Sequence, residues 1–344
     1  MSDDRAQTLE VSLTWPLRPI LTSLNGDNSW LISFPRPEQD GRAKYFYHVA
    51  FEPWLTGPTT KISSWLVHIS LKTKAAMGHG DAVQEAAGAI EQVAATVAKE
   101  HNGVIRVRSE THEDGYNGAV DAIFLFLDEV DHCHRPTLET FDKRVPFIGS
   151  KEVVAKVSPW QHFESITTLT ELDASLDTWQ GDNVRPSPFP EWLTAFKLPG
   201  ESFLNFVGVF VWTHTTASGE VIHESILDSP HGTESLYQDG SPINAFLASK
   251  PPTRQLALLH GLKESFTTRF WRTTHGAEAG LRMYRKTDSK YWIMSHEAEL
   301  GYKGVVLRAT TFDTARTLDW ALEREGGKDV DFKEVGNGNS FVMM

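Results

Sequence analysis

Four segments typical of β-strands are each followed, within a few residues, by a histidine. The segments are 119–126, 220–227, 255–259 and 291–294, and the residues that follow them are Asp131-His132, His231, His260 and Ser295-His296. Ligands of sheet-based enzymes gather where strands reach their carboxyl ends. Imidazole and carboxylate groups bind divalent metals, and histidine also transfers protons near neutral pH. The pattern therefore predicts a metal or acid–base site at one edge of a sheet.

A histidine at a single strand end is weak evidence, because most such residues only make hydrogen bonds within loops. The recurrence at four comparable positions is stronger and favours a functional set. Two of the four histidines are followed directly by glycine, at Gly232 and Gly261. Glycine has no side chain beyond its hydrogen, so it allows the backbone to approach a site closely.

Short motifs around these positions resemble the metallo-β-lactamase superfamily, in particular the lactonase-like branch related to ascorbate-6-phosphate lactonase. The motifs occur in the order expected for that fold. They are Leu127-Asp-Glu-Val-Asp-His132, where the family has His-x-His-x-Asp-His, then Ser229-Pro-His-Gly232 and Ser295-His-Glu297. The segment Phe51-Glu-Pro-Trp-Leu-Thr-Gly57 is similar to an Asp-Pro-Trp-x-x-Gly motif of that branch, with Glu52 in place of the aspartate.

The resemblance implies that one of the two usual metal sites is altered. Two of the first-metal histidines would fall at Leu127 and Glu129, and the third at Glu201, after Pro199-Gly200. Leucine cannot bind a metal, so Glu129 and Glu201 are the only oxygen ligands left to a residual first site.

The second metal site is better preserved under the same resemblance. Asp131, His132 and His296 match its ligands, and His231 falls near the bridging aspartate. These four residues are the predicted ligands of one divalent metal, with zinc first and iron or manganese as alternatives, or with no metal at all. His260 has no ligand counterpart and is the predicted acid–base group; Asp131 is the other candidate base.

Composition limits the partners that the protein can have. The formal net charge is −12 over 344 residues, which disfavours nucleic acids and anionic membranes. The single cysteine, Cys133, excludes an intrachain disulfide and agrees with a reducing compartment. The N-terminal residues carry no signal-peptide pattern. We expect a cytoplasmic protein that binds a small molecule; the sequence does not indicate its oligomeric state.

The pattern of elements predicts an α/β protein. Early strands are expected at 29–34, 45–51 and 62–71, a long amphipathic helix at 81–100, and strands alternating with helices thereafter. The polar stretch 170–199 is interpreted as an irregular excursion, a candidate lid. This pattern indicates a layered α/β sandwich. The resemblance to the metallo-β-lactamase superfamily implies a four-layer αββα sandwich, formed by a single domain over 1–344 with insertions at about 73–118 and 165–200.

The function predicted from these features is metal-dependent hydrolysis of an ester, a lactone or an amide in a small, apolar molecule. Two alternatives remain open. The same histidines could serve a lyase, isomerase or cyclase as acid–base groups without a metal, or the chain could be a non-catalytic small-molecule-binding protein. Fold resemblance does not choose among them, because function resides in the site.

Overall fold

The structure is a computed structural model, and it describes residues 9–40, 43–61, 63, 65–101, 118–175, 178–267, 270–305, 310–327 and 330–344. The chain divides into two compact units. The first contains Met1–Gly57, Thr73–Thr167 and Val335–Met344, and the second contains Pro58–Lys72 and Thr168–Glu334. Each unit combines helices with β-sheet, so the predicted α/β class is confirmed. The predicted sandwich of four layers and the single domain stay predictions.

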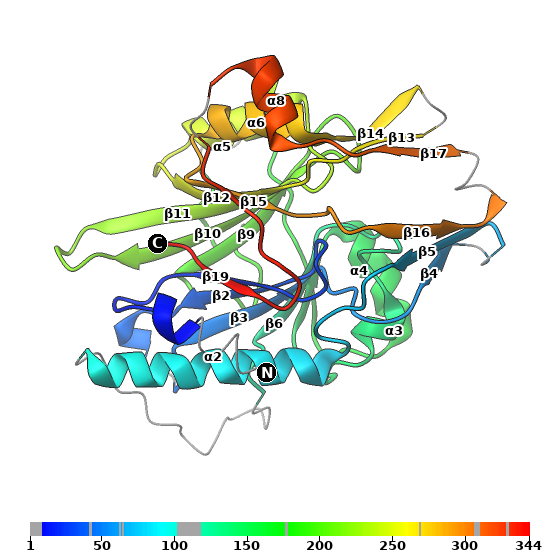
Figure 1. The fold of residues 1–344 in the computed structure, drawn as a ribbon. Coiled ribbons are helices and arrows are strands. Elements are labelled where there is room, and N and C mark those ends of the chain that lie inside the picture. Colours follow the sequence, from blue (N-terminus) through cyan, green and yellow to red (C-terminus); the bar gives the residue numbers. More distant parts are fainter. Residues whose placement is uncertain are drawn as a thin grey trace. The chain divides into compact units, whose positions relative to one another are not determined.

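The first unit is built on a seven-stranded sheet with the order β19-β1-β2-β3-β6-β7-β8 (Figure 1). The strands are β1 (Ile20–Ser23), β2 (Trp30–Pro35), β3 (Phe46–Phe51), β6 (Ala122–Leu125), β7 (Phe147–Gly149), β8 (Ile166–Thr168) and β19 (Ser340–Val342). Strands β19, β1, β2 and β3 are antiparallel neighbours, whereas β3, β6 and β7 run parallel. The parallel part directs the end of β6 toward the Asp131-His132 turn.

Helices of the first unit pack on its sheet. The longest, α2 (Gly80–Glu100), buries an apolar stripe that includes Val83, Ala87 and Ile90, as its helical spacing predicts. Its first turn is capped by the His79 side chain, which accepts a hydrogen bond from Ala82 N–H. The others are α3 (Arg135–Leu138), α4 (Lys151–Val157) and the short 3-10 turns η1 (Glu38–Asp40) and η2 (Ser158–Trp160). Side chains of α2, α3 and α4 share one apolar cluster with the strands.

The second unit contains a six-stranded sheet with the order β18-β15-β12-β11-β10-β9. Its strands are β9 (Leu193–Leu198), β10 (Val207–Thr215), β11 (Val221–Asp228), β12 (Arg254–His260), β15 (Tyr291–Met294) and β18 (Phe332–Lys333). Strands β11, β12 and β15 are parallel. Because their carboxyl ends meet at one edge, this sheet gathers the segments that carry His231, His260 and His296.

Helices and two smaller sheets complete the second unit (Figure 1). The helical elements are η3 (Ser235–Tyr237), α5 (Pro242–Ala248), α6 (Gly276–Thr287) and α8 (Leu318–Glu325). One three-stranded sheet has the order β14-β13-β17 and consists of β13 (Glu264–Thr267), β14 (Trp271–His275) and β17 (Thr311–Thr314). The other has the order β16-β5-β4 and consists of β4 (Thr59–Lys61), β5 (Val67–Leu71) and β16 (Leu300–Lys303). Of the predicted strand 62–71, the structure describes β5 over Val67–Leu71, which pairs antiparallel with both β4 and β16; residues 62 and 64 lie outside the described residues.

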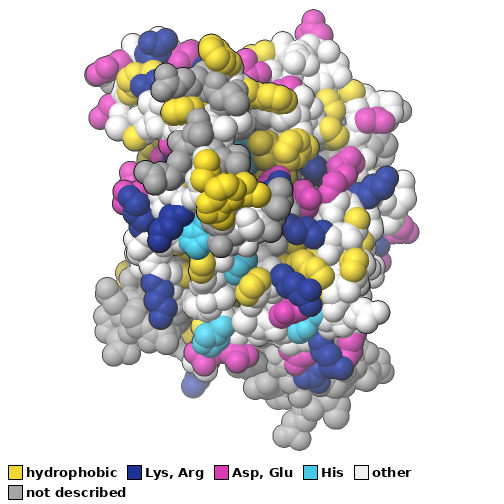
Figure 2. All heavy atoms as spheres, turned by 90° about the vertical axis from the view of Figure 1, so that its right-hand side faces the viewer, with side chains coloured by type: hydrophobic (Ala, Val, Ile, Leu, Met, Phe, Trp, Pro, Cys, Tyr) yellow, Lys and Arg dark blue, Asp and Glu magenta, His cyan; other side chains and the backbone are white. Residues whose placement is uncertain are grey.

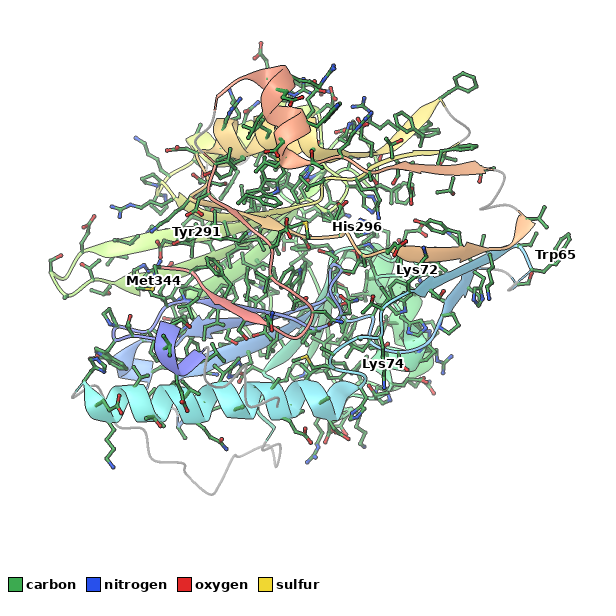
Figure 3. The ribbon with its side chains drawn as sticks, viewed as in Figure 1. Trp65, Lys72, Lys74, Tyr291, His296 and Met344 are labelled. Atoms are coloured by element: carbon green, nitrogen blue, oxygen red, sulfur yellow. The ribbon has the colours of Figure 1, made fainter. Side chains whose placement is uncertain are left out.

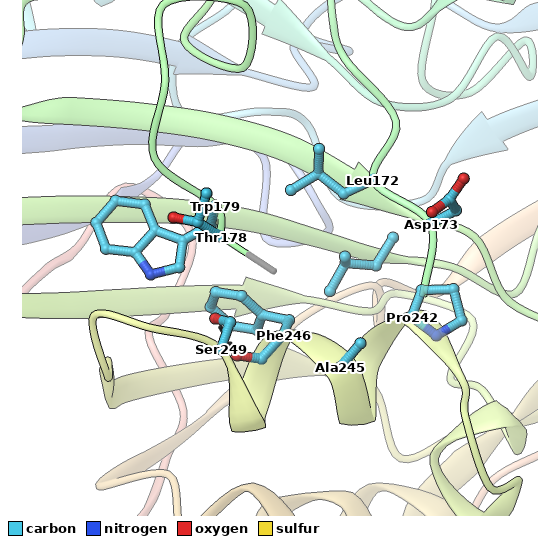
Figure 4. Close-up of a pocket in the computed structure, with 9 residues that line it drawn as sticks. Leu172, Asp173, Thr178, Trp179, Pro242, Ala245, Phe246 and Ser249 are labelled. Carbon is cyan, nitrogen blue, oxygen red and sulfur yellow. Dashed lines mark hydrogen bonds between the residues drawn. The ribbon is translucent and has the colours of Figure 1, made fainter. Parts of the chain in front are cut away.

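The stretch 170–199 was predicted to be irregular, and this is wrong for its last part. Residues 193–198 form β9, an edge strand paired with β10. Leu172, Trp179 and Val184 pack into the apolar cluster of the six-stranded sheet, because these three large side chains need burial. A small pocket lies between this stretch and α5 (Figure 4); none of the predicted site residues lines it. The role of a lid stays a prediction.

Several large apolar side chains of the second unit are exposed. Phe270 and Trp271, at the turn between β13 and β14, are 94% and 66% exposed, and Trp65 is 70% exposed. Figure 2 shows one face of the molecule on which hydrophobic side chains stand among charged ones. Among the helices that the structure describes, none has the length and apolar character needed to cross a membrane.

The burial of Ile90 on α2 generates a test of the first unit's core. We expect Ile90→Ala to lower the free energy of unfolding by about 2–5 kcal/mol, because it removes apolar contacts and leaves a cavity. Gln92→Ala, at an exposed position of the same helix, serves as the control and should change it by less than about 0.5 kcal/mol. Denaturant titration measures both; equal losses would contradict the packing described here.

Candidate functional site

The first unit presents Asp131 and His132 in a turn that follows β6. The N–H groups of His132 and Cys133 donate to the carbonyl of Glu129 at 3.0 and 2.7 Å, which closes the turn. His132 is almost fully buried and Asp131 is partly buried. Cys133 is also buried, and burial raises the pKa of its thiol to about 12, so it stays protonated at neutral pH. The thiol is therefore a core side chain in this structure.

Glu52 holds this turn to the sheet. One carboxylate oxygen accepts hydrogen bonds from Phe126 N–H at 2.6 Å and Leu127 N–H at 3.3 Å, and the other lies 3.2 Å from Nδ1 of His132. Glu52 is 1% exposed and has a φ of 46° in the left-handed region, which is uncommon for a residue with a side chain. When the ring is neutral, an Nδ1–H that donates to Glu52 leaves Nε2 of His132 with its lone pair.

The charge environment of His132 is strongly acidic. Burial lowers the pKa of the imidazole, but the hydrogen bond to Glu52 and the charges of Glu52, Asp131 and Asp27 outweigh it and raise the pKa to about 9. An acidic surrounding of this kind stabilises positive charge on the ring or on a cation bound to it. The two residues predicted at first-metal positions near this turn have different surroundings: Leu127 is a buried apolar side chain and Glu129 is partly buried.

The second unit brings His231 and His296 together. His231 lies in the loop after β11, and His296 follows β15, where Figure 3 labels it. Their ring centroids are 4.7 Å apart with an angle of 56° between the rings. Nδ1 of His231 lies 3.0 Å from Oγ1 of Thr274, a buried residue of β14. These two predicted ligands therefore form a close imidazole pair.

The backbone around His231 and His296 includes an uncommon conformation and a close approach of two segments. His296 has a φ of 59°, again in the left-handed region, although it is buried. A Cβ atom at Gly261 would lie 2.9 Å from the carbonyl oxygen of Ser295, so only glycine permits this approach. Glu297 accepts hydrogen bonds from Leu262 N–H at 2.7 Å and Lys263 N–H at 2.9 Å, which ties the two strand ends together.

His260 lies beneath the His231 loop and is completely buried. Its Nδ1 lies 2.6 Å from the carbonyl oxygen of Gly261, whereas Nε2 has no hydrogen-bond partner among the described residues. A Cβ atom at Gly232 would lie only 2.7 Å from that Nε2. Burial lowers the pKa of His260 to about 4, so the ring is neutral at neutral pH. Its predicted role in proton transfer stays a prediction.

Glu201, the candidate for a residual first-metal ligand, is engaged in other contacts. Its carboxylate lies 3.0 Å from Nε2 of His275 and accepts hydrogen bonds from the Thr233 hydroxyl at 2.5 Å and from Glu234 N–H at 2.9 Å. Burial raises the pKa of Glu201, but these hydrogen bonds outweigh it and lower the pKa to about 2. The ionised carboxylate thus holds the residues that directly follow the His231 loop.

Sequence reasoning missed three residues that hold the predicted ligands. Glu52 was noted only as a replacement in a motif, although its position next to a predicted strand end was a usable signal. Thr274 gave no signal, because the hairpin of β13 and β14 was not predicted, and Asn205, which lies between β9 and β10, gave none either. The Asn205 side-chain N–H donates to the carbonyl of Gly232 at 2.9 Å and so fixes the His231 loop.

Comparison with known proteins finds similar folds only among solved structures. No family model and no curated protein sequence matches the chain. Isothiocyanate hydrolase from Delia radicum gut bacteria matches with a TM-score of 0.54 and 13% identity, covering 94% of this chain and 99% of that one. A possible metal-dependent hydrolase from Veillonella parvula DSM 2008 matches with a TM-score of 0.50 and 10% identity, with the same coverages.

At these identities the likeness concerns the fold alone. The metallo-β-lactamase type of fold and the lactonase branch stay predictions. This chain shares the fold of these two proteins over nearly their whole length, and its activity has to be argued from its own residues.

The contact between Glu52 and His132 predicts a specific pH dependence. In metal-free protein, Glu52→Gln should lower the pKa of His132 from about 9 by about two units or more, because the carboxylate charge is lost while burial remains. Proton NMR titration of the His132 ring measures it. Glu91→Gln, which alters the contact of a different histidine, His48, should leave the pKa of His132 unchanged.

The raised pKa of His132 also makes the free energy of unfolding depend on pH. Because the pKa of His132 is higher in the folded than in the unfolded chain, the group stabilises the fold fully below about pH 6.5. This contribution should be lost as the pH rises through about 9. Unfolding free energies of wild type and Glu52→Gln should therefore converge with rising pH; a constant difference would contradict the assignment.

Proposed function

We propose that the protein is a hydrolase that uses one divalent metal, held by His132, His231 and His296. These three histidines could hold a metal ion. His132 belongs to the first unit, and His231 and His296 belong to the second.

The observation that carries the proposal is the anchoring of the imidazole rings. Nδ1 of His132 lies beside the Glu52 carboxylate and Nδ1 of His231 beside the Thr274 hydroxyl. Histidines that bind metals usually donate their other ring N–H to a carboxylate, hydroxyl or carbonyl, which fixes the ring and the tautomer. Both rings would then offer Nε2 to a metal.

The donor set fits a catalytic metal better than a structural one. Three imidazole nitrogens suit zinc, with iron or manganese as alternatives. Three protein ligands leave a fourth position open, whereas structural sites have four. When bound, the metal acts as a Lewis acid on a carbonyl group and makes water more acidic.

Asp131 is better suited to accept a proton than to act as a fourth ligand. Its carboxylate is partly buried and makes no hydrogen bond or ion pair with the residues that the structure describes, and it is not part of the three-histidine group. It directly precedes His132, so it lies beside the proposed metal. In the proposal Asp131 takes the proton of the attacking water, and neutral His260 remains a second candidate acceptor.

Esters, lactones and amides of small apolar molecules are the proposed substrates, since each has a carbonyl group that a Lewis acid polarises. One structural neighbour carries the name isothiocyanate hydrolase. Isothiocyanates also have an electrophilic carbon that water can attack, so they belong in the substrate panel. Ester and lactone probes come first because their hydrolysis is simple to follow.

Metal analysis tests the proposed ligands. Protein purified without chelators should contain about one metal ion per chain, and His132→Ala, His231→Ala and His296→Ala should each lose it, because two imidazoles hold a divalent metal weakly. His223→Gln is the matched control, since that ring contacts Thr213. Added zinc should raise the thermal midpoint of wild type and control only. Wild type that hydrolyses substrate without metal would overturn the proposal.

The role of Asp131 is tested separately. Asp131→Asn should lower kcat by about 10²–10⁴-fold, because the amide cannot accept the proton. Its metal content should stay at the wild-type level. Asp128→Asn, in the same loop, should keep activity within about 3-fold of wild type. Loss of the metal in Asp131→Asn would instead identify this carboxylate as a ligand.

A further inference from the structure

Strand β14 contributes a side chain directly to the candidate ligand pair. Thr274 is 3% exposed, and its Oγ1 lies 3.0 Å from Nδ1 of His231. Thr273 lies at an irregularity in the pairing of β13 with β14, and its hydroxyl donates to the carbonyl of Ser265 at 3.2 Å instead. Of these two adjacent threonines, Thr274 alone contacts His231.

The backbone of the His231 loop is held by several other contacts. His275 N–H donates to the carbonyl of His231 at 2.9 Å, and Gly232 N–H donates to the carbonyl of Ser229 at 3.0 Å. The Asn205 side chain fixes the carbonyl of Gly232. These bonds fix where the side chain of His231 starts, but they do not fix the rotation of its ring. The hydroxyl of Thr274 acts on the ring itself.

We infer that Thr274 is a positioning residue that sets the orientation and the tautomer of His231. When Oγ1 accepts the hydrogen on Nδ1, the lone pair lies on Nε2, which is the nitrogen available to a cation. The effect on metal affinity rests on the proposed function, whereas the effect on the tautomer does not.

Valine at position 274 isolates this hydrogen bond. Valine has nearly the shape of threonine, so Thr274→Val removes the hydroxyl and little else. Nδ1 of His231 then loses its hydrogen bond to Thr274, and the loss of a hydrogen bond inside the protein costs free energy. The ring is expected to populate other rotamers and both neutral tautomers. Thr274→Ser keeps the hydroxyl and should restore the wild-type state.

Zinc affinity is the first readout, measured by competition with a chromophoric chelator at fixed pH. Thr274→Val should weaken zinc binding by about 10–100-fold, the usual effect of losing the partner of a metal-bound histidine. Thr274→Ser and Thr273→Val should bind zinc within about 3-fold of wild type. The far-UV circular dichroism of all variants should be unchanged, which separates positioning from misfolding.

The tautomer of His231 is the second readout, measured by nitrogen-15 NMR of the ring in metal-free protein. Wild type and Thr274→Ser should show the Nδ1–H form, and Thr274→Val a mixture of both forms. Wild-type zinc affinity together with an unchanged tautomer in Thr274→Val would overturn the inference, as would equal weakening in Thr273→Val. If wild type bound no zinc, the proposed function would fail, and the tautomer alone would decide the role of Thr274.

Discussion

The buried hydrogen bond between Glu52 and His132 is the interaction on which the orientation of the His132 ring depends. A single carboxylate accepts bonds from the backbone just after β6 and contacts the imidazole that follows the turn. It therefore couples the end of the sheet to the orientation of the ring. Burial of this carboxylate without hydrogen-bond partners would cost free energy, because an ion loses its hydration on burial. Glu52, which stands where the similar motif has an aspartate, thus holds the backbone after β6 and the ring of His132 in place.

In the second unit, an uncommon backbone conformation positions His296. The left-handed φ of His296 costs about 1–3 kcal/mol and persists only where neighbouring contacts hold it. Glu297, immediately after it, binds two N–H groups of the segment that follows β12. Gly261 allows the carbonyl of Ser295 to approach that segment. Strain at a buried histidine that faces another histidine is typical of a site where ring placement matters more than local stability.

Much of the regular structure could be predicted from the sequence, and the reasons are local. The helical stripe on α2 and the apolar runs of β2, β3, β11, β12 and β15 have clear periods, so they lie where expected. The strand-end histidines follow from the same runs. Strands β13, β14 and β17 could not be predicted, because they are short and mix polar with apolar types. Thr274 was missed for this reason, since its role depends on a long-range pairing.

The residues at the positions predicted for first-metal ligands have other roles in this structure. Leu127 is buried and apolar, so it stabilises the end of β6 by packing and offers no lone pair. Glu201 is ionised, but its oxygens already bind Thr233, Glu234 N–H and His275. Thr233 follows Gly232 directly, so this carboxylate fixes the end of the loop that carries His231. Glu201, which was predicted as a residual first-metal ligand, therefore supports the position of His231.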